Sequence, residues 1–304
     1  MSGSLFRPPP LAPPRDFRVD LLPCAELVAR IEDESVDLVL VDPAYPSLEK
    51  HRAKGTTTRL KVSDASSNAW FEVQSWDDLR VFLREAFRVL RPARHAYVLC
   101  DDETSAWMRR EGWAAGFYVW PALTWVKTGP APEVSAVASP EVETVGVDDG
   151  TRLRIGMGYH YRQTTERVVF LEKREGRLPK ERGDGIEAVP DPWGKGRQLA
   201  NLGIPNALHV DAVRGDGAYP TEKPVELLEV LIRQSTEPGE LVLDPCCGSG
   251  SAGEAALKAG RRVWLGDRSS VAVDRARARC DRALALGVRS GWPARFAPRE
   301  IDGG

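Results

Sequence analysis

The sequence predicts an α/β protein with a mainly parallel sheet and helices on both faces of that sheet. Residues 36–41 form a nearly continuous apolar strand, which is what a parallel sheet covered on both faces requires. Residues 241–267 read as strand, glycine-rich turn, helix and strand, the succession of a βαβ unit. Helix and strand patterns also alternate in the first part of the chain. These three observations favour the α/β class over all-α and all-β folds.

The expected elements follow from short apolar or periodic runs. In the first part of the chain we expect strands at 17–22, 36–41, 95–100, 118–126 and 168–172, and helices at 24–31 and 76–90. The second of these helices ends before Pro92, which cannot continue it. In the last part we expect helices at 221–234, 251–259 and 270–285, and strands at 241–243 and 262–265.

Four stretches have no clear period and are expected to lie outside the sheet. Residues 1–16 are proline-rich and are interpreted as a flexible arm. Residues 46–68 and 129–158 are interpreted as loops. Residues 174–218 carry many glycine, proline and charged residues, so we expect a small irregular subdomain there rather than more sheet.

The composition is ordinary for a soluble globular protein and restricts the possible partners. The 304 residues are 42% apolar and their formal net charge is −2. This charge gives no global attraction to a polyanion, so any nucleic-acid surface must be a local basic patch. No run approaches the roughly 18 apolar residues of a membrane span, and no apolar signal core opens the chain. We therefore expect a cytoplasmic protein without a membrane partner.

The cysteines predict neither a metal site nor a disulfide framework. The five cysteines contain no Cys-x-x-Cys pair, and only four histidines accompany them. A reducing cytosol is the compartment that fits this pattern best.

A glycine-rich turn after the strand at 241–243 is the first candidate binding site. Residues 244–251 read Asp-Pro-Cys-Cys-Gly-Ser-Gly-Ser; glycines let a backbone turn tightly, and the N–H groups of the following helix favour a carboxylate. Asp267 ends the next strand, where an acidic side chain can accept hydrogen bonds from both hydroxyls of a ribose. The pattern outlines a nucleoside pocket, but it is neither GxGxxG nor a P-loop. A glycine turn alone would suit a structural loop equally well.

The second candidate site is the tetrapeptide Asp42-Pro43-Ala44-Tyr45, which directly follows the apolar strand 36–41. Catalytic residues gather at the carboxyl ends of parallel strands. An isolated tetrapeptide of this kind is more simply an Asp-Pro turn. Its meaning therefore depends on whether the glycine-rich turn belongs to the same site.

The two motifs together resemble those of the β group of amino DNA methyltransferases. The resemblance rests on the cofactor motif at 243–252, the preceding Pro-Thr-Glu-Lys-Pro at 220–224 and the catalytic tetrapeptide within 41–45. Residues 87–92, 125–127 and 156–162, the last leading to Glu166, are also similar to segments of that family. The catalytic motif precedes the cofactor motif by roughly 200 residues, which is the permuted order of the β group.

The resemblance implies a circularly permuted, Rossmann-like, S-adenosylmethionine-dependent methyltransferase fold with a small target-recognition insertion. It divides the chain into an arm (1–16), a catalytic half (17–173, with loops 46–68 and 129–158), a target-recognition segment (174–218) and a cofactor-binding half (219–304). Ala44, Tyr219 and Cys246 depart from the proline, histidine and phenylalanine that are common in the family. Neither Ala44 nor Tyr219 removes a catalytic group.

The resemblance also implies which residues carry out the chemistry. The Asp42 carboxylate and the Pro43 carbonyl would accept the two amino hydrogens of a base, and Tyr45 would stack on that base after it leaves the duplex. The candidate ligands of S-adenosyl-L-methionine are Thr221, Lys223, Asp244, Pro245, Cys246, Gly248, Ser249, Gly250 and Asp267. No metal is expected.

Two basic stretches are candidates for DNA contact. Residues 50–61 contain five Lys or Arg and no acid, which suits either a phosphate clamp or a solvated loop. Basic and aromatic residues are interleaved at 152–162. The candidate DNA-binding residues are Lys50, His51, Arg52, Lys54, Arg59, Lys61, Tyr159, His160 and Arg162. The arginines at 275, 277, 279 and 282 are interpreted as a solvated helix face.

The expected function is methylation of the N6 amino group of adenine in a specific duplex DNA sequence, by base flipping and direct transfer. N4 methylation of cytosine is the main alternative because both chemistries share one geometry, and Asp rather than Ser at position 42 favours adenine by resemblance. RNA or protein methylation and a catalytically silent DNA-binding relative are further alternatives. The expected partners are duplex DNA, a second copy of the chain in a homodimer and a cognate restriction endonuclease, at the nucleoid of a bacterial cell or in a phage-infected one.

Overall fold

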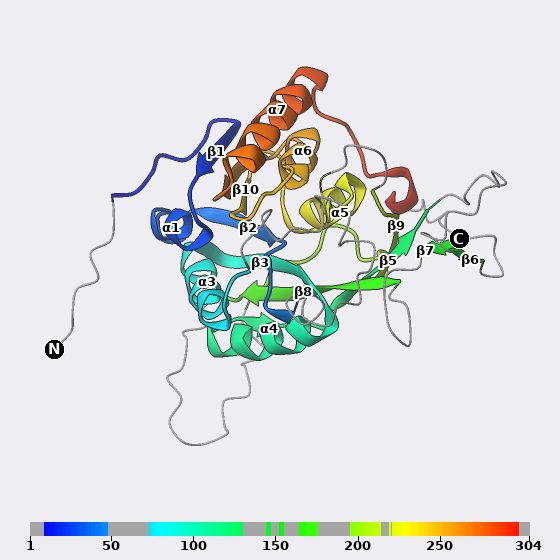
Figure 1. Cartoon of the computed structure of the whole chain (residues 1–304), viewed down its shortest axis with the longest axis horizontal. Coiled ribbons are helices and arrows are strands. Elements are labelled where there is room, and N and C mark those ends of the chain that lie inside the picture. Colours follow the sequence, from blue (N-terminus) through cyan, green and yellow to red (C-terminus); the bar gives the residue numbers. More distant parts are fainter. Residues whose placement is uncertain are drawn as a thin grey trace, which may run out of the picture.

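The computed structural model describes residues 9–47, 73–129, 164–175, 195–213, 219 and 221–297, together with the backbone of 144–146 and 152–154. Within these residues, eleven strands form one sheet, and helices cover both of its faces (Figure 1). The predicted α/β class is therefore confirmed.

The parallel part of the sheet brings the two ends of the chain together. Its order is β1 (Phe17–Leu21), β11 (Arg262–Asp267), β10 (Leu241–Asp244), β2 (Val36–Val41) and β3 (Leu90–Cys100), with every neighbouring pair parallel. Strand β10 lies against β2, with Val242 opposite Leu38 and Leu243 opposite Val39. The chain continues from β10 to β11 on one side and from β2 to β3 on the other. The β10–β2 boundary is thus the topological switch point, where α/β folds bind their ligands.

Beyond β3 the sheet is largely antiparallel. Strand β8 (Thr165–Lys173) pairs with β3, with β4 (Tyr118–Val119) and with β5 (Leu123–Thr128). The edge continues through β7 (Arg152–Arg154) and β6 (Thr144–Gly146), while β9 (Ala207–Asp211) pairs with β5 in parallel. The parallel pairing expected from the sequence is therefore right for the half of the sheet that contains both motifs.

Two helical layers bury the sheet (Figure 1). One layer contains α5 (Val225–Ser235), α6 (Ser251–Lys258) and α7 (Ser270–Leu286), and the other contains α1 (Cys24–Ala29), α3 (Trp76–Val89) and α4 (Asp102–Ala114). Leu38 and Leu40 of β2 belong to the apolar cluster of the first layer, and Val39 and Val41 belong to that of the second. This alternation explains why β2 is apolar on both faces. Among the described helices, none has the length and apolar character needed to cross a membrane.

Asp37 is the polar exception within β2, and three groups compensate for its burial. Its Oδ1 accepts hydrogen bonds from Arg91 at 2.5 Å and from Arg94 at 3.3 Å, and its Oδ2 accepts the Leu241 N–H at 2.8 Å. A buried carboxylate is tolerated when it is paired and hydrogen-bonded in this way. Asp37 thus ties β2 to its neighbours β10 and β3 at the amino end of the strand, opposite to the end that Asp42 follows.

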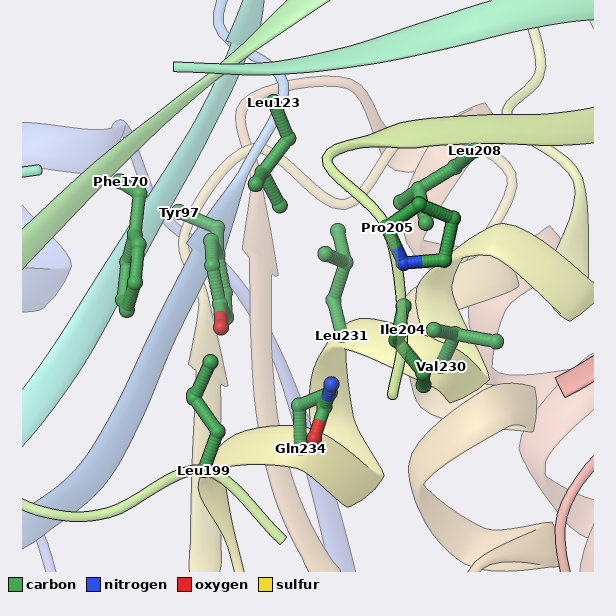
Figure 2. A pocket seen from close by; sticks show the side chains of 10 residues that line it. All are labelled: Tyr97, Leu123, Phe170, Leu199, Ile204, Pro205, Leu208, Val230, Leu231 and Gln234. Atoms are coloured by element: carbon green, nitrogen blue, oxygen red, sulfur yellow. The ribbon is translucent and has the colours of Figure 1, made fainter. Parts of the chain in front are cut away.

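The interpretation of 174–218 as a region without further strands is wrong at 207–211, which form β9. Leu208 and Val210 of this strand are buried, and the preceding segment packs over α5. A small apolar cavity of about 40 Å³ lies between this segment, the Tyr97 and Phe170 rings of the sheet, and Leu231 of α5. Figure 2 shows the side chains that line this cavity. Five residues with two apolar positions give too short a pattern to identify such a strand from sequence.

Three further expectations need correction. Residues 9–16 are not a free arm: the Leu11 N–H donates to the Arg30 carbonyl at 3.0 Å, and Pro14 is buried; residues 1–8 lie outside the described part. The loop expected at 129–158 contains β6 and β7.

Helix α4 was not predicted, because charged residues interrupt its apolar period. Asp101 caps this helix by accepting the Thr104 N–H at 2.7 Å.

Candidate active site

Acidic side chains stand at the carboxyl ends of four neighbouring parallel strands. Asp42 follows β2, Asp244 ends β10, Asp267 ends β11 and Asp101 follows β3. Burial raises the pKa of Asp244, and the nearby Asp42 and Asp267 carboxylates raise it further. The fold therefore concentrates carboxyl groups at the switch point, where a cationic ligand would stabilise their ionised forms.

Asp42 is paired with Lys223, which the sequence predicts to bind the cofactor. The Lys223 Nζ lies 2.5 Å from Asp42 Oδ2 and donates a second hydrogen bond to the Thr221 carbonyl at 3.2 Å. The Lys223 side chain is 9% exposed and that of Asp42 is 28% exposed, so a ligand reaches the carboxylate end of the pair. Burial raises the pKa of Asp42 above its usual range, while the Lys223 ammonium acts in the opposite direction.

Glu166 and Lys127 extend this pair into a chain of alternating charges. Lys127 Nζ lies 2.6 Å from Glu166 Oε1, and Lys223 Nζ lies 3.4 Å from Glu166 Oε2. Burial alone would raise the pKa of Glu166, but the two ammonium groups outweigh it and the pKa is lowered. The Asp42–Lys223 pair thus has two charged neighbours that were not among the predicted site residues.

Tyr45 and Pro43 lie beside Asp42. Pro43 is buried, and the Tyr45 ring packs against the apolar cluster below α3 and α4. Burial raises the pKa of the Tyr45 hydroxyl, and the Asp42 and Glu166 carboxylates raise it further. The ring is therefore a neutral, rigid aromatic surface, as stacking on a base requires.

Gln74 joins the catalytic tetrapeptide to the cofactor loop, and sequence reasoning did not identify it. Its N–H donates to the Ala44 carbonyl at 2.8 Å, and its side-chain amide donates to Cys246 Sγ at 3.2 Å. The hydrogen bond with the Cys24 thiol and, to a smaller extent, burial raise the pKa of Cys246 well above its ordinary range. Cys246 is accordingly a neutral thiol at the junction of both motifs.

The glycine loop has the conformation that its sequence predicts. Gly248 and Gly250 have φ values of +47° and +79°, a region that favours glycine. A side chain at Gly250 would come within 2.6 Å of the Ala276 Cα, so only glycine lets the loop approach α7. Asp267 accepts the Gly248 N–H at 3.0 Å and the Ser269 N–H at 2.9 Å, and its carboxylate keeps acceptor capacity for a ribose.

Asp244 is the most deeply buried carboxylate of the site, with 6% exposure. It accepts the Cys246 N–H at 3.1 Å, and burial raises its pKa well above the ordinary range. Pro245 is buried behind it. A carboxyl group with little local compensation is suited to pairing with a positively charged ligand.

Arg279 holds the cofactor loop from the side of α7. It forms ion pairs with Glu222 at 2.7 Å and with Glu254 at 2.5 Å, and it donates to Ser249 Oγ at 3.2 Å. Its side chain is 17% exposed, so the interpretation of this arginine series as a solvated face is wrong at position 279. Its partners come from α6 and from the segment before α5, and no local pattern reveals them.

The nine predicted DNA-binding residues lie at 50–61 and 159–162, outside the described residues. The described residues contain no group of three or more His, Cys, Asp or Glu that could hold a metal ion. Of the predicted cofactor residues, those at 244–250 form the glycine loop and Asp267 is hydrogen-bonded to it. Lys223 instead pairs with Asp42 and with the carbonyl of Thr221, so these two residues lie on the side of Asp42.

The glycine loop at one strand end and the Asp-Pro turn at the next define a class of Rossmann-like enzymes that bind a nucleoside-type cofactor at the switch point. The model of the N6/N4 DNA methylase family matches residues 36–283, and the chain belongs to this family of DNA methyltransferases.

Relatives and solved structures are similar over most of the chain. The type II methyltransferase M2.DpnII of Streptococcus pneumoniae is 25% identical over 253 residues, covering 78% of this chain and 79% of that protein. The Thermus thermophilus protein TTHA0409, solved in complex with S-adenosyl-L-methionine, has a TM-score of 0.52 at 19% identity, over 88% of this chain and 94% of its own. The cytosine-N4-specific PvuII DNA methyltransferase has a TM-score of 0.54 at 14% identity, over 89% and 91%. These structures share the fold of this chain.

Proposed function

We propose that the protein transfers a methyl group from S-adenosyl-L-methionine to the N6 amino group of adenine in duplex DNA. The observation that carries this proposal is that the Asp42 side chain, although paired with Lys223, is 28% exposed. Its Oδ2 is engaged by Lys223, which leaves Oδ1 for an amine hydrogen of the base. The Pro43 carbonyl accepts the second hydrogen, so the nitrogen lone pair turns toward the methyl group.

The residues around the glycine loop fit the proposed cofactor. The carboxylates of Asp42, Asp244 and Asp267 suit a ligand that carries a sulfonium and an ammonium group. The N–H groups at the start of α6 suit its carboxylate, and Asp267 suits its ribose. When bound, this cofactor supplies an electrophilic methyl group on sulfur. The other predicted ligands in this part of the chain, Pro245, Cys246 and Ser249, belong to the same loop.

Tyr45 supports a base-flipping step. Its neutral ring lies next to Asp42, and a base that leaves the duplex loses a few kcal/mol of stacking, part of which an aromatic face restores. In this proposal residues 17–173 act as the catalytic half, 174–218 read the target sequence and 219–304 hold the cofactor. The same proposal includes two partners, a second copy of the chain and a cognate restriction endonuclease. It places the protein at the bacterial nucleoid.

Analysis of methylated nucleosides tests the choice of base. DNA with all four bases is incubated with protein and S-adenosyl-L-methionine, digested, and examined by mass spectrometry, with RNA as a parallel substrate. We expect N6-methyl-2′-deoxyadenosine from DNA and no methylated nucleoside from RNA. N4-methylcytosine would show that the site accepts cytosine, which is a real alternative because PvuII methyltransferase shares this fold. Methylated RNA without methylated DNA would contradict the substrate class.

A further inference from the structure

Four charged side chains from four separate elements form one connected row beside the proposed reaction centre. Lys127 from β5, Glu166 from β8, Lys223 from the segment before α5 and Asp42 from the end of β2 alternate in sign. Their joining distances, in that order, are 2.6, 3.4 and 2.5 Å. We call these four residues the charge row.

Within the charge row, Glu166 pairs with two lysines at once. One of its oxygens faces Lys127 and the other faces Lys223. Lys223 is in turn shared between Glu166 and Asp42, and it is 9% exposed. A buried ammonium takes a position set by all of its partners. The location of the cation on Asp42 Oδ2 therefore depends on residues that do not touch Asp42.

Asp42 can accept an amine hydrogen only when it is ionised, and the neighbouring groups have opposing effects on its ionisation. Burial favours the neutral acid. Lys223 and Lys127 favour the carboxylate, whereas the Glu166 charge opposes it. Among the residues that the structure describes, the other titratable groups whose electrostatics involve Asp42 are Asp244 from β10, Cys100 from β3 and Tyr45. An ionised Asp244 would oppose ionisation of Asp42 as well, because like charges repel.

We propose that Glu166 and Lys127 are positioning residues for methyl transfer: acting through Lys223, they hold its ammonium on Asp42 Oδ2 and leave Oδ1 directed to the substrate amine. The two residues have opposite effects on the ionisation of Asp42, because the Lys127 charge favours the carboxylate and the Glu166 charge opposes it. This inference rests on the proposed function. It assigns roles to two residues that contact neither base nor cofactor in the proposed geometry.

The inference requires that two substitutions move the acid limb of the pH–rate profile in opposite directions. In Lys127→Met a positive charge is lost, Asp42 becomes harder to ionise, and the acid limb moves to higher pH by about 1 unit. In Glu166→Gln a negative charge is lost, and the acid limb moves to lower pH. Simple damage to the site would lower the rate at every pH without opposite shifts.

The experiment measures single-turnover methyl transfer to DNA by the full chain across a range of pH. Lys127→Arg keeps the charge and is expected to restore the wild-type profile. The double variant Lys127→Met/Glu166→Gln removes both charges, and its limb is expected to return toward that of the wild type. Arg167→Gln is the matched control, because Arg167 follows Glu166 on β8 and its side chain is 39% exposed. The acid limb of this variant is expected to coincide with that of the wild type.

Limbs that coincide with the wild type in both single variants, or that move in the same direction, would overturn the inference. Cofactor binding and thermal melting identify a variant that does not fold, and the double variant and Lys127→Arg then decide the question. A wild-type protein that methylates no DNA at any pH would refute the proposed function instead, so the two failures are distinguishable.

Discussion

Asp42 and Asp244 end adjacent strands but lie in different electrostatic surroundings. Asp42 has an ammonium group at 2.5 Å, whereas Asp244 accepts one backbone N–H and is buried beside two other carboxylates. Both positions could be predicted, because each acid follows an apolar strand. The approach of Lys127 and Glu166 to the Asp42–Lys223 pair could not be predicted, since it depends on how β5 and β8 pair.

Replacement of Asp244 by Asn is expected to stabilise the protein without cofactor at neutral and alkaline pH. Burial raises the pKa of Asp244, so the folded state retains a proton that the unfolded chain has released. The free energy of unfolding of the wild type therefore falls as the pH rises through the raised pKa. Denaturant unfolding is expected to give a larger advantage for Asn at about pH 8.5 than at about pH 5.

The same variant is expected to bind S-adenosyl-L-methionine more weakly, because an amide, unlike the carboxyl group of Asp244, cannot release a proton and pair as an anion with a cationic ligand. A titration of cofactor by calorimetry measures the loss, with the wild type as reference. An Asn variant that is less stable than the wild type at both pH values would show that the Asp244 charge does not oppose folding.

At the scale of elements, α7 connects the glycine loop to the rest of the site. Its buried positions recur at Ala272, Val273, Ala276, Cys280 and Ala283, and this period made the helix predictable. The role of Arg279 could not be predicted, because Glu254 lies on α6 and Glu222 precedes α5. A helical pattern shows which face is apolar, but it does not show which charged residues at the border of that face find partners.

Arg279→Ala is expected to lower the free energy of unfolding by about 1–3 kcal/mol, because the Glu222 and Glu254 carboxylates lose their shared cation. Loss of the bond to Ser249 is also expected to weaken cofactor binding. Arg282→Ala is the matched control on the same helix: Arg282 is exposed, and its removal is expected to change stability by less than about 0.5 kcal/mol. Equal effects of the two substitutions would contradict this role for Arg279.

At the scale of the whole molecule, the site exists only because two distant parts of the chain form adjacent strands. The pairing of β10 with β2 unites the catalytic turn with the cofactor loop. Motif order and apolar strands were sufficient to predict this arrangement. The strand β9, the edge hairpin of β6 and β7 and the packed residues 9–16 were not predictable, since short segments acquire their structure from the sheet to which they attach.

The net charge of −2 has a consequence at this scale. A protein with almost no net charge must approach DNA through a local surface, and the predicted basic stretch at 50–61 directly follows the catalytic tetrapeptide. The DNA-binding role of that stretch stays a prediction. Substitution of its lysines and arginines is expected to weaken DNA binding and to reduce the salt dependence of the affinity.

The most direct test of the central claim compares methyl transfer by the wild-type protein and by Asp42→Ala. Both proteins are incubated with duplex DNA and S-adenosyl-L-methionine that carries a labelled methyl group, after circular dichroism and thermal melting have shown that both are folded. We expect the wild type to label DNA and Asp42→Ala to be slower by about 100-fold or more, because the group that orients the amine is gone. Equal rates of labelling would contradict the assignment of Asp42 as the catalytic carboxylate.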